Sequence, residues 1–224
     1  MEKEIKGIEE IDEIKYKEDM ESQEEEWKKE MEDRKNNPSL YMAKGGIKQR
    51  YLSATLDGIK LPPRIIKTAE QFIAGKIDGL FLTGVIGSGK TYLACAIARE
   101  LVIQGKSVRF KSAPELFEDI RASFNGRGSE YEIIDRLSKT KYLIIDDAGA
   151  EKSSDFTLDR LYLIIDHRYS DELPTIITSN LSLNDIKNRI HDRLASRISE
   201  MCETIVMPNK DLRLELKVKG GDKK

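Results

Sequence analysis

Short apolar runs recur along the chain and are separated by longer segments with a helical repeat. The runs lie at residues 79–83, 107–111, 142–145, 175–178 and 204–207. Residues 142–145 are apolar throughout, which is typical of a strand buried on both faces of a sheet. Strands that alternate with helices predict a parallel sheet with helices on both faces, so we expect an α/β fold with five parallel strands.

The segments between these runs have apolar residues at every third or fourth position, which predicts amphipathic helices. The expected helices lie at residues 91–101, 114–124, 130–138, 158–169 and 186–198. In the last of them Ile186, Ile190, Leu194 and Ile198 are spaced by four, so we predict one continuous helix there.

The first 36 residues differ from the rest in charge and in pattern. They carry 15 acidic and 8 basic side chains, a net charge of −7, whereas residues 37–224 have a net charge of +5. Tyr16, Met20, Trp27 and Met31 are spaced by 4, 7 and 4 and would lie on one narrow stripe of a helix. This stripe fits a partner-binding helix, and it equally fits a solvated helix without a partner.

Chain-breaking residues divide the sequence further. Asn36, Asn37 and Pro38 end the first segment, and the Pro62-Pro63 pair interrupts an irregular, partly helical stretch that follows. We therefore expect a helical arm at 1–36, a lead-in at 37–75, an α/β domain at 76–214 and a disordered tail at 215–224.

Composition argues against membrane and secreted proteins. No apolar run approaches the ~18 residues of a membrane span, and the acidic N-terminus lacks the apolar core of a signal peptide. Cys95 and Cys202 are far apart and have no metal-ligand spacing. We expect reduced, buried thiols in a cytoplasmic protein with no membrane partner.

Residues 84–91 read G-V-I-G-S-G-K-T and match the phosphate-binding pattern G-x-x-x-x-G-K-[ST] in full. Glycines let backbone N–H groups wrap a polyphosphate, Lys90 neutralises phosphate charge, and the Thr91 hydroxyl ligates Mg²⁺. We therefore expect ATP and Mg²⁺ to bind here. The predicted nucleotide-binding residues are Gly84, Val85, Ile86, Gly87, Ser88, Gly89, Lys90, Thr91 and Tyr92.

Polar residues also follow two other predicted strands. Asp146 and Asp147 come directly after the run at 142–145, at the end of the strand where parallel sheets bind ligands. We expect Asp146 to hold Mg²⁺ and Asp147 to orient and deprotonate an attacking water. Asn180 follows the run at 175–178; it would contact the γ-phosphate or the water, or else cap the next helix.

Arg189, Arg193 and Arg197 are spaced by four beside the apolar row of the last predicted helix. Such a row is either a solvated basic face or the source of an arginine finger, which stabilises phosphate charge in a neighbouring subunit.

Four stretches together resemble one family, the DnaC/DnaI helicase loaders and the related IstB transposition helpers. They read I-D-D-A-G-A-E-K, D-F-T-L-D-R-L-Y-L-I-I-D-H-R-Y, P-T-I-I-T-S-N-L-S-L and D-R-L-A-S-R-I. The lead-in stretch G-I-K-Q-R-Y is also similar, so that the resemblance covers about residues 45–214.

The resemblance implies an AAA+ ATPase, with the phosphate-loop strand central in the sheet, that delivers a DnaB-like replicative helicase to single-stranded DNA. It implies Asn180 as sensor 1 and Arg197 as the arginine finger, with Arg193 as the second choice. Arg213 matches a late arginine that serves as a sensor-2-like contact. A homo-oligomer that forms on ATP binding is also implied.

The sequence departs from the family pattern in three places. Asp147 stands where many AAA+ proteins have Glu, so we expect slow hydrolysis. No cysteines stand where some members carry an N-terminal zinc domain, and the sequence ends soon after Arg213, which leaves no sizeable helical lid. The alternatives are an IstB-like transposition helper, a P-loop kinase for a small molecule, and a nucleotide switch that does not hydrolyse ATP.

Charge suggests separate surfaces for protein and for DNA. The acidic arm would repel a phosphate backbone, so we expect it to bind the helicase, with Trp27 as the anchor. The candidates for single-stranded DNA contact are Arg121, Arg127, Arg136 and Lys139, with Phe124 for base stacking. The alternative is that these are ordinary surface cations.

Overall fold

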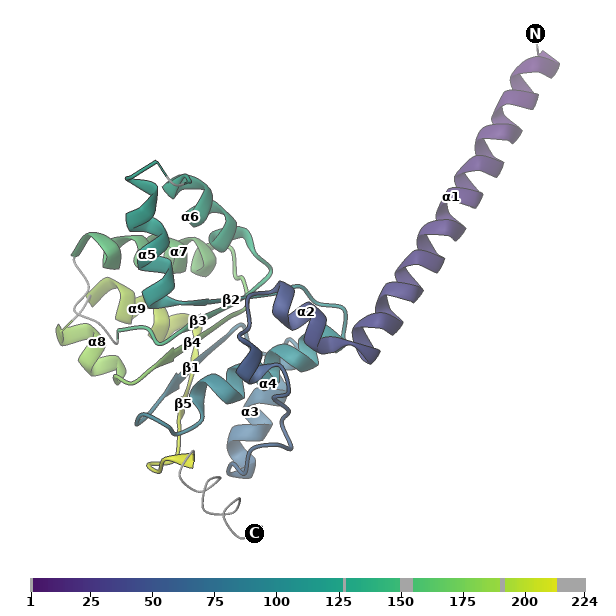
Figure 1. The fold of residues 1–224 in the computed structure, drawn as a ribbon. Coiled ribbons are helices and arrows are strands. Elements are labelled where there is room, and N and C mark those ends of the chain that lie inside the picture. Colours follow the sequence, from purple (N-terminus) through teal and green to yellow (C-terminus); the bar gives the residue numbers. More distant parts are fainter. Residues whose placement is uncertain (1, 127, 150–154, 190–191, 213–224) are drawn as a thin grey trace.

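The structure is a computed structural model that describes residues 2–126, 128–149, 155–189 and 192–212, with side chains from Asp19 onward except those of Asp155 and Arg189. Its strands form one sheet (Figure 1). They are β1 (Gly79–Thr83), β2 (Val108–Ser112), β3 (Tyr142–Asp146), β4 (Thr175–Ser179) and β5 (Glu203–Val206). The order is β2-β3-β4-β1-β5 and every pair is parallel, which confirms the predicted five-stranded parallel sheet.

The position of β1 in this order corrects one expectation. β1 is an interior strand between β4 and β5, but the central position belongs to β4. In the part of the chain that the structure describes, one strand, β5, lies beyond β1 and three strands lie on its other side.

Helices cover both faces of the sheet (Figure 1). They are α1 (Glu2–Asn36), α2 (Pro38–Lys44), the 3-10 helix η1 (Gln49–Tyr51), α3 (Pro63–Ile73), α4 (Lys90–Ile103), α5 (Ala113–Ser123), α6 (Glu130–Lys139), α7 (Asp155–Ser170), α8 (Leu183–Arg189) and α9 (Asp192–Met201). Side chains alternate between the faces, as strand geometry requires. Leu80 and Leu82 pack with α2, α3 and α4, whereas Phe81 packs with α5 to α9.

The helix predicted at 186–198 is two helices. α8 ends at Arg189 and α9 begins at Asp192, and residues 190–191 lie outside the described residues. Spacing by four gave no sign of this break, because Ile186 and Leu194 both pack in the same core although they belong to different helices. Asp192 stands in the first turn of α9, where a carboxylate stabilises a helix N-terminus.

The lead-in packs into the core and covers one edge of the sheet. Met42, Ile65 and Phe72 are buried in the cluster that contains β1 and α4. At the outer edge of β2, the Phe110 N–H donates to the Gly45 carbonyl at 2.8 Å. Gly46 has φ +96°, and a Cβ there would lie 2.7 Å from the Phe110 carbonyl oxygen. Glycine at this position lets the lead-in approach the edge strand closely.

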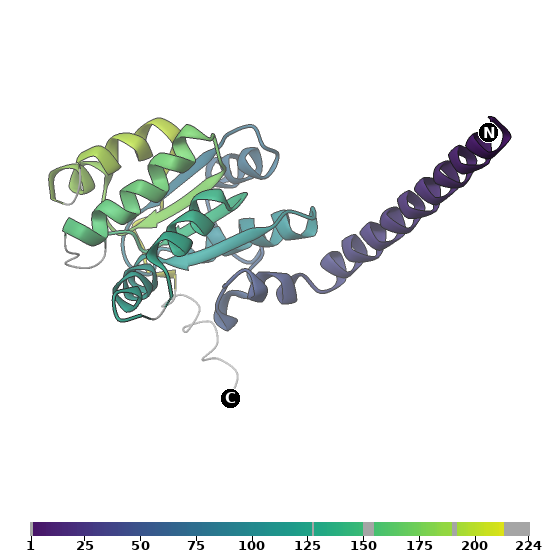
Figure 2. The same cartoon turned by 90° about the horizontal axis from the view of Figure 1, so that it is seen from above.

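α1 extends away from the rest of the molecule in both views (Figures 1 and 2). Met20 and Trp27 are 49% and 60% exposed. Contact with the body comes near the end of the helix, where Met31 lies beside Gly105 and Arg34 donates to the Lys106 carbonyl. The side chain of Tyr16 lies outside the described residues. No helix among the described residues has the length and the hydropathy needed to cross a membrane.

Candidate nucleotide-binding site

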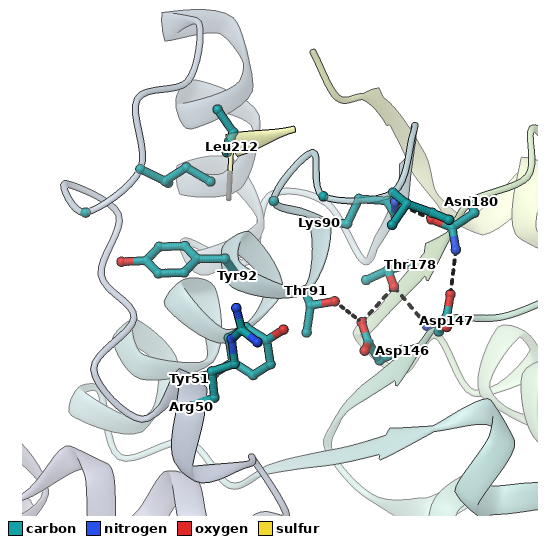
Figure 3. Close-up of a pocket in the computed structure, with 15 residues that line it drawn as sticks. Arg50, Tyr51, Lys90, Thr91, Tyr92, Asp146, Asp147, Thr178, Asn180 and Leu212 are labelled. Atoms are coloured by element: carbon teal, nitrogen blue, oxygen red, sulfur yellow. Dashed lines mark hydrogen bonds between the residues drawn. The ribbon is translucent and has the colours of Figure 1, made fainter. Parts of the chain in front are cut away.

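A cavity of about 560 Å³ opens at the carboxyl ends of β1, β3 and β4 (Figure 3). It is lined by Arg50, Tyr51, Gly58, Ile59, Ile86, Gly87, Gly89, Lys90, Thr91, Tyr92, Asp146, Asp147, Thr178, Asn180 and Leu212. β4 lies between β1 and β3, so it brings Thr178 and Asn180 between the phosphate loop and Asp146. The cavity therefore unites three sequence motifs that are far apart along the chain.

The phosphate loop joins β1 to α4, which begins at Lys90. Gly87 and Gly89 have φ values of +82° and +92°, which side chains rarely adopt. A Cβ on Gly89 would lie 2.6 Å from Ile59 Cδ1, and one on Gly87 would collide with the Asp211 carboxyl group. The positive φ values are what favours glycine at both positions, because the atoms that a Cβ would meet are the ends of the flexible Ile59 and Asp211 side chains.

Lys90 is buried, and its ammonium group donates three hydrogen bonds. Nζ donates to the carbonyls of Gly84 and Val85 at 2.8 and 2.9 Å and to Asn180 Oδ1 at 2.6 Å. Polar acceptors thus hold the charge inside the loop, at the start of a helix whose N-terminus favours anions. Buried Ser88 Oγ has no hydrogen-bond partner among the described residues. An unsatisfied hydroxyl beside a buried lysine suits a loop that closes around an oxygen-rich anion.

Asp146 accepts two hydrogen bonds on the same oxygen. Thr91 Oγ1 donates to Asp146 Oδ1 at 2.9 Å, and Thr178 Oγ1 donates to it at 2.7 Å (Figure 3). Burial raises the pKa of Asp146, while the hydrogen bonds from Thr178 and Thr91 lower it by less. The Thr91 hydroxyl and the Asp146 carboxylate are hard oxygen donors, and Mg²⁺ is usually held by one or two carboxylates together with phosphate oxygens. These residues therefore fit a magnesium ion.

Asp147 has an unusual backbone conformation for a residue with a side chain, with φ +60°. Two hydrogen bonds with neighbouring side chains hold Asp147 in this conformation. Its N–H donates to Thr178 Oγ1 at 2.9 Å, and Asn180 Nδ2 donates to Asp147 Oδ1 at 2.9 Å. Asn180 therefore links Lys90 to Asp147, and the carboxylate of Asp147 faces the cavity. Strained backbone that its surroundings hold in place is common at functional sites.

Several residues of the cavity were not identified from the sequence. Arg50, Tyr51 and Ile59 come from the lead-in, and Leu212 follows β5, where its N–H donates to the Gly87 carbonyl at 3.0 Å. Thr178 was expected at the end of the fourth strand, next to Asn180, but no role in the site was predicted for it. The lead-in resemblance at residues 46–51 was the one available signal, because contacts between distant segments leave no spacing pattern.

Arg197 and Arg193, the two candidates for the arginine finger, do not line the cavity. Arg197 is on α9, where Nε donates to Asp166 Oδ1 of α7 at 2.7 Å. Arg193 is exposed on the same helix. Arg213, the expected sensor-2-like contact, and Arg127 lie outside the described residues.

This sheet order, with a G-V-I-G-S-G-K-T loop after β1 and Asp146-Asp147 after β3, defines a P-loop nucleotide-binding protein of the AAA+ type. The chain belongs to the IstB-like ATP binding protein family, whose sequence profile matches residues 5–220.

Among known proteins, the chain is 31% identical to the replicative helicase loader DnaI of Bacillus subtilis, over 72% of this chain and 54% of that protein. It is 25% identical to the replicative helicase loader DnaC of Buchnera aphidicola, over 70% of this chain and 68% of that protein. A crystal structure of DnaI superposes with a TM-score of 0.64 at 31% identity, covering 72% of this chain and 95% of that one. The chain spans about half of the full-length DnaI sequence and about two thirds of the full-length DnaC sequence.

Proposed function

We propose that this chain hydrolyses ATP in the cavity between β1, β3 and β4. The observation that carries the proposal is the Lys90–Asn180–Asp147 chain of hydrogen bonds at the mouth of the phosphate loop. Lys90 exchanges its loop acceptors for phosphate oxygens, and Asn180 holds the Asp147 carboxylate toward the cavity. Asp147 then accepts the proton of the attacking water.

Thr91 and Asp146 would hold Mg²⁺ in this proposal, and the ion would supply positive charge to the phosphates. Asp146 must be ionised for this role, although burial raises its pKa. The described residues contain no cluster of three or more His, Cys, Asp or Glu side chains suited to a metal. Phosphate oxygens of the nucleotide would complete the magnesium site, as is usual for this ion.

Two variants test the assignment. Lys90→Ala should abolish tight ATP binding, because the polyphosphate loses its main cation. Asp147→Asn should keep ATP affinity and lower turnover by roughly 10²–10⁴-fold, since only the proton acceptor is lost. Nucleotide titration and phosphate release measure the two effects, and Lys76→Ala, an exposed lysine after α3, is the control. Equal ATP affinity in wild type and Lys90→Ala would reject the site, and zero wild-type turnover would favour a nucleotide switch.

We further propose that the ATPase loads a replicative helicase onto single-stranded DNA. The support is that relatives named as helicase loaders match both in sequence and in solved structure. The exposed arm α1 would bind the helicase, and the surface of α5 and α6 would contact DNA. Phe124 is 59% exposed there and lies edge-on to Phe156, while Lys139 pairs with Asp135.

The test is transfer of a purified replicative helicase to single-stranded DNA with the chain and ATP. We expect transfer with wild type and none with Lys90→Ala. An IstB-like transposition helper is the second candidate, because the matching family is IstB-like. Stimulation of a transposase, without any effect on helicase transfer, would establish that alternative.

We also propose that Arg197 acts on ATP held by a neighbouring subunit, with Arg193 as the alternative finger. The support is that Arg197 lies outside its own chain's cavity on a partly exposed helix face. Turnover per subunit should then rise with protein concentration. Arg197→Ala should reduce turnover and leave nucleotide affinity nearly intact.

A further inference from the structure

A cluster of charged and aromatic side chains surrounds Arg197 on α7 and α9. Nε donates to Asp166 Oδ1 at 2.7 Å, and the guanidinium carbon lies 4.5 Å from the centre of the Tyr169 ring. Nη1 is 3.8 Å from Glu200 Oε2. None of these residues lines the nucleotide cavity. The cluster therefore has no direct part in nucleotide binding by its own chain.

The groups that contact Arg197 are themselves held in place. Tyr162 donates its hydroxyl to Asp166 Oδ1 at 3.2 Å, and Tyr169 donates its hydroxyl to Glu200 Oε1 at 2.6 Å. The Arg197 guanidinium lowers the pKa of Asp166 through its hydrogen bond, so Asp166 is ionised at neutral pH. Asp166 and the Tyr169 ring thus restrict the guanidinium from two sides.

Stability is a poor explanation for this arrangement. The side chains of Arg197 and Asp166 are 33% and 34% exposed, and ion pairs with that much contact with water contribute little to folding. What the contacts do is to limit the conformations of a long, flexible side chain. Asp166 engages Nε, the nitrogen nearest the backbone, so the Nη nitrogens form the outer end of the guanidinium group.

We propose that Asp166 and Tyr169 are positioning residues that hold Arg197 ready to contact ATP bound to a neighbouring subunit. The inference rests on the proposed ATPase function and on Arg197 acting between subunits. A side chain that is already oriented loses less freedom when the neighbour's phosphate arrives, and small errors in its placement reduce the rate strongly.

Mixed assemblies separate this role from a structural one. In the reference mixture, Asp147→Asn subunits supply Arg197, and Arg197→Ala subunits supply an intact site, so turnover should exceed that of either variant alone. Asp166→Ala is then added to one kind of subunit at a time. On the Asp147→Asn subunit, which donates the finger, it should lower the recovered turnover by about tenfold. On the Arg197→Ala subunit it should have less than about a twofold effect, because no finger remains to be positioned.

Two further variants sharpen the comparison. Asp166→Asn keeps a hydrogen-bond acceptor for Nε and should restore most of the turnover lost in Asp166→Ala. Asp171→Ala removes an exposed carboxylate just beyond α7 and should leave the recovered turnover unchanged in both kinds of subunit.

The outcomes are distinct. Equal loss in both placements would mean that Asp166 supports folding or assembly, and no loss in either would mean that Arg197 needs no support; both results overturn the proposal. A reference mixture without recovery, from variants shown to associate, rejects the finger itself and the positioning role with it. Wild-type turnover, measured alone, reports separately on the ATPase function.

Discussion

At the scale of single residues, Asp146 combines a functional requirement with a cost to the fold. It is partly buried, and Thr91 and Thr178 donate to the same oxygen. Burial raises its pKa, so the folded chain holds a proton at pH values where the unfolded chain is already ionised. The stability that this group contributes is present below the ordinary pKa of 3.8 and is lost as the pH rises through the raised pKa.

Asp146→Asn should therefore raise the melting temperature of the nucleotide-free chain at neutral pH, by a few degrees. The amide oxygen still accepts both threonine hydroxyls, and the buried charge is gone. The same variant should lose most of the added stability that Mg²⁺ and ATP give to wild type. Thermal unfolding with and without Mg²⁺ and ATP measures both effects, with the exposed Asp171→Asn as control. A melting temperature lower than that of wild type would contradict the inference that the charge of Asp146 destabilises the nucleotide-free fold.

The residues of this site differ in how far sequence could reveal them. Lys90, Thr91 and Asp146 stand in fixed patterns beside apolar strands, because phosphate and metal binding dictate both residue type and spacing. Ile59 and Leu212 have no such constraint. They reach the cavity only because the lead-in and the segment after β5 fold over the phosphate loop, which is a property of the tertiary structure.

At the scale of secondary-structure elements, the sheet was predictable because its strands are apolar runs bounded by polar residues. The edge cover at Gly45 was not predictable, because it depends on Phe110, a partner distant in sequence. The division between α8 and α9 was not predictable either, because the spacing by four continues across it and both helices pack in the same core. The buried Arg168 of α7 is a third such case. It is a charged side chain with no exposed surface, and the sequence around it gave no sign that this arginine is buried.

Arg168 joins the ends of several elements, and no carboxylate among the described residues pairs with it. Its guanidinium donates to Thr175 Oγ1 at 2.8 Å, and to carbonyls at the end of α6 and before β3 and β4. The carbonyl acceptors are Leu137, Ser138, Thr140, Lys141 and Pro174. Burial lowers its pKa to about 10, so it remains charged at neutral pH. Planar geometry lets one side chain serve acceptors in three directions.

Arg168→Met should destabilise the fold by about 3 kcal/mol or more, because it leaves several buried acceptors without a donor. Arg168→Lys should recover only part of the loss, since an ammonium group lacks the planar fork. Denaturant unfolding of both variants measures this, with the exposed Arg136→Met of α6 as the matched control. Near-wild-type stability of Arg168→Met would show that water replaces the guanidinium.

At the scale of the whole molecule, charge and shape separate two surfaces. The arm has a net charge of −7 and projects from a body with a net charge of +5 (Figures 1 and 2). Met31, Asp33 and Arg34 anchor the end of α1, through contacts with Gly105, Tyr41 and Lys106. The part before these residues, which includes exposed Met20 and Trp27, is therefore removable without disturbing the anchor.

Removal of residues 1–28 should abolish helicase capture and leave ATP-dependent binding of single-stranded DNA measurable. Within the full chain, Trp27→Ala should weaken capture by tenfold or more, as expected for an aromatic anchor, whereas Glu26→Ala should be nearly silent. Arg121→Glu with Arg136→Glu should do the opposite: capture persists, while DNA affinity falls and becomes less dependent on salt, because fewer counterions are released. Pull-down with a replicative helicase and fluorescence anisotropy with labelled single-stranded DNA measure the two activities on the same preparations. If the shortened chain captured the helicase at full affinity, α1 would be a solvated extension, and the helicase would have to bind the body.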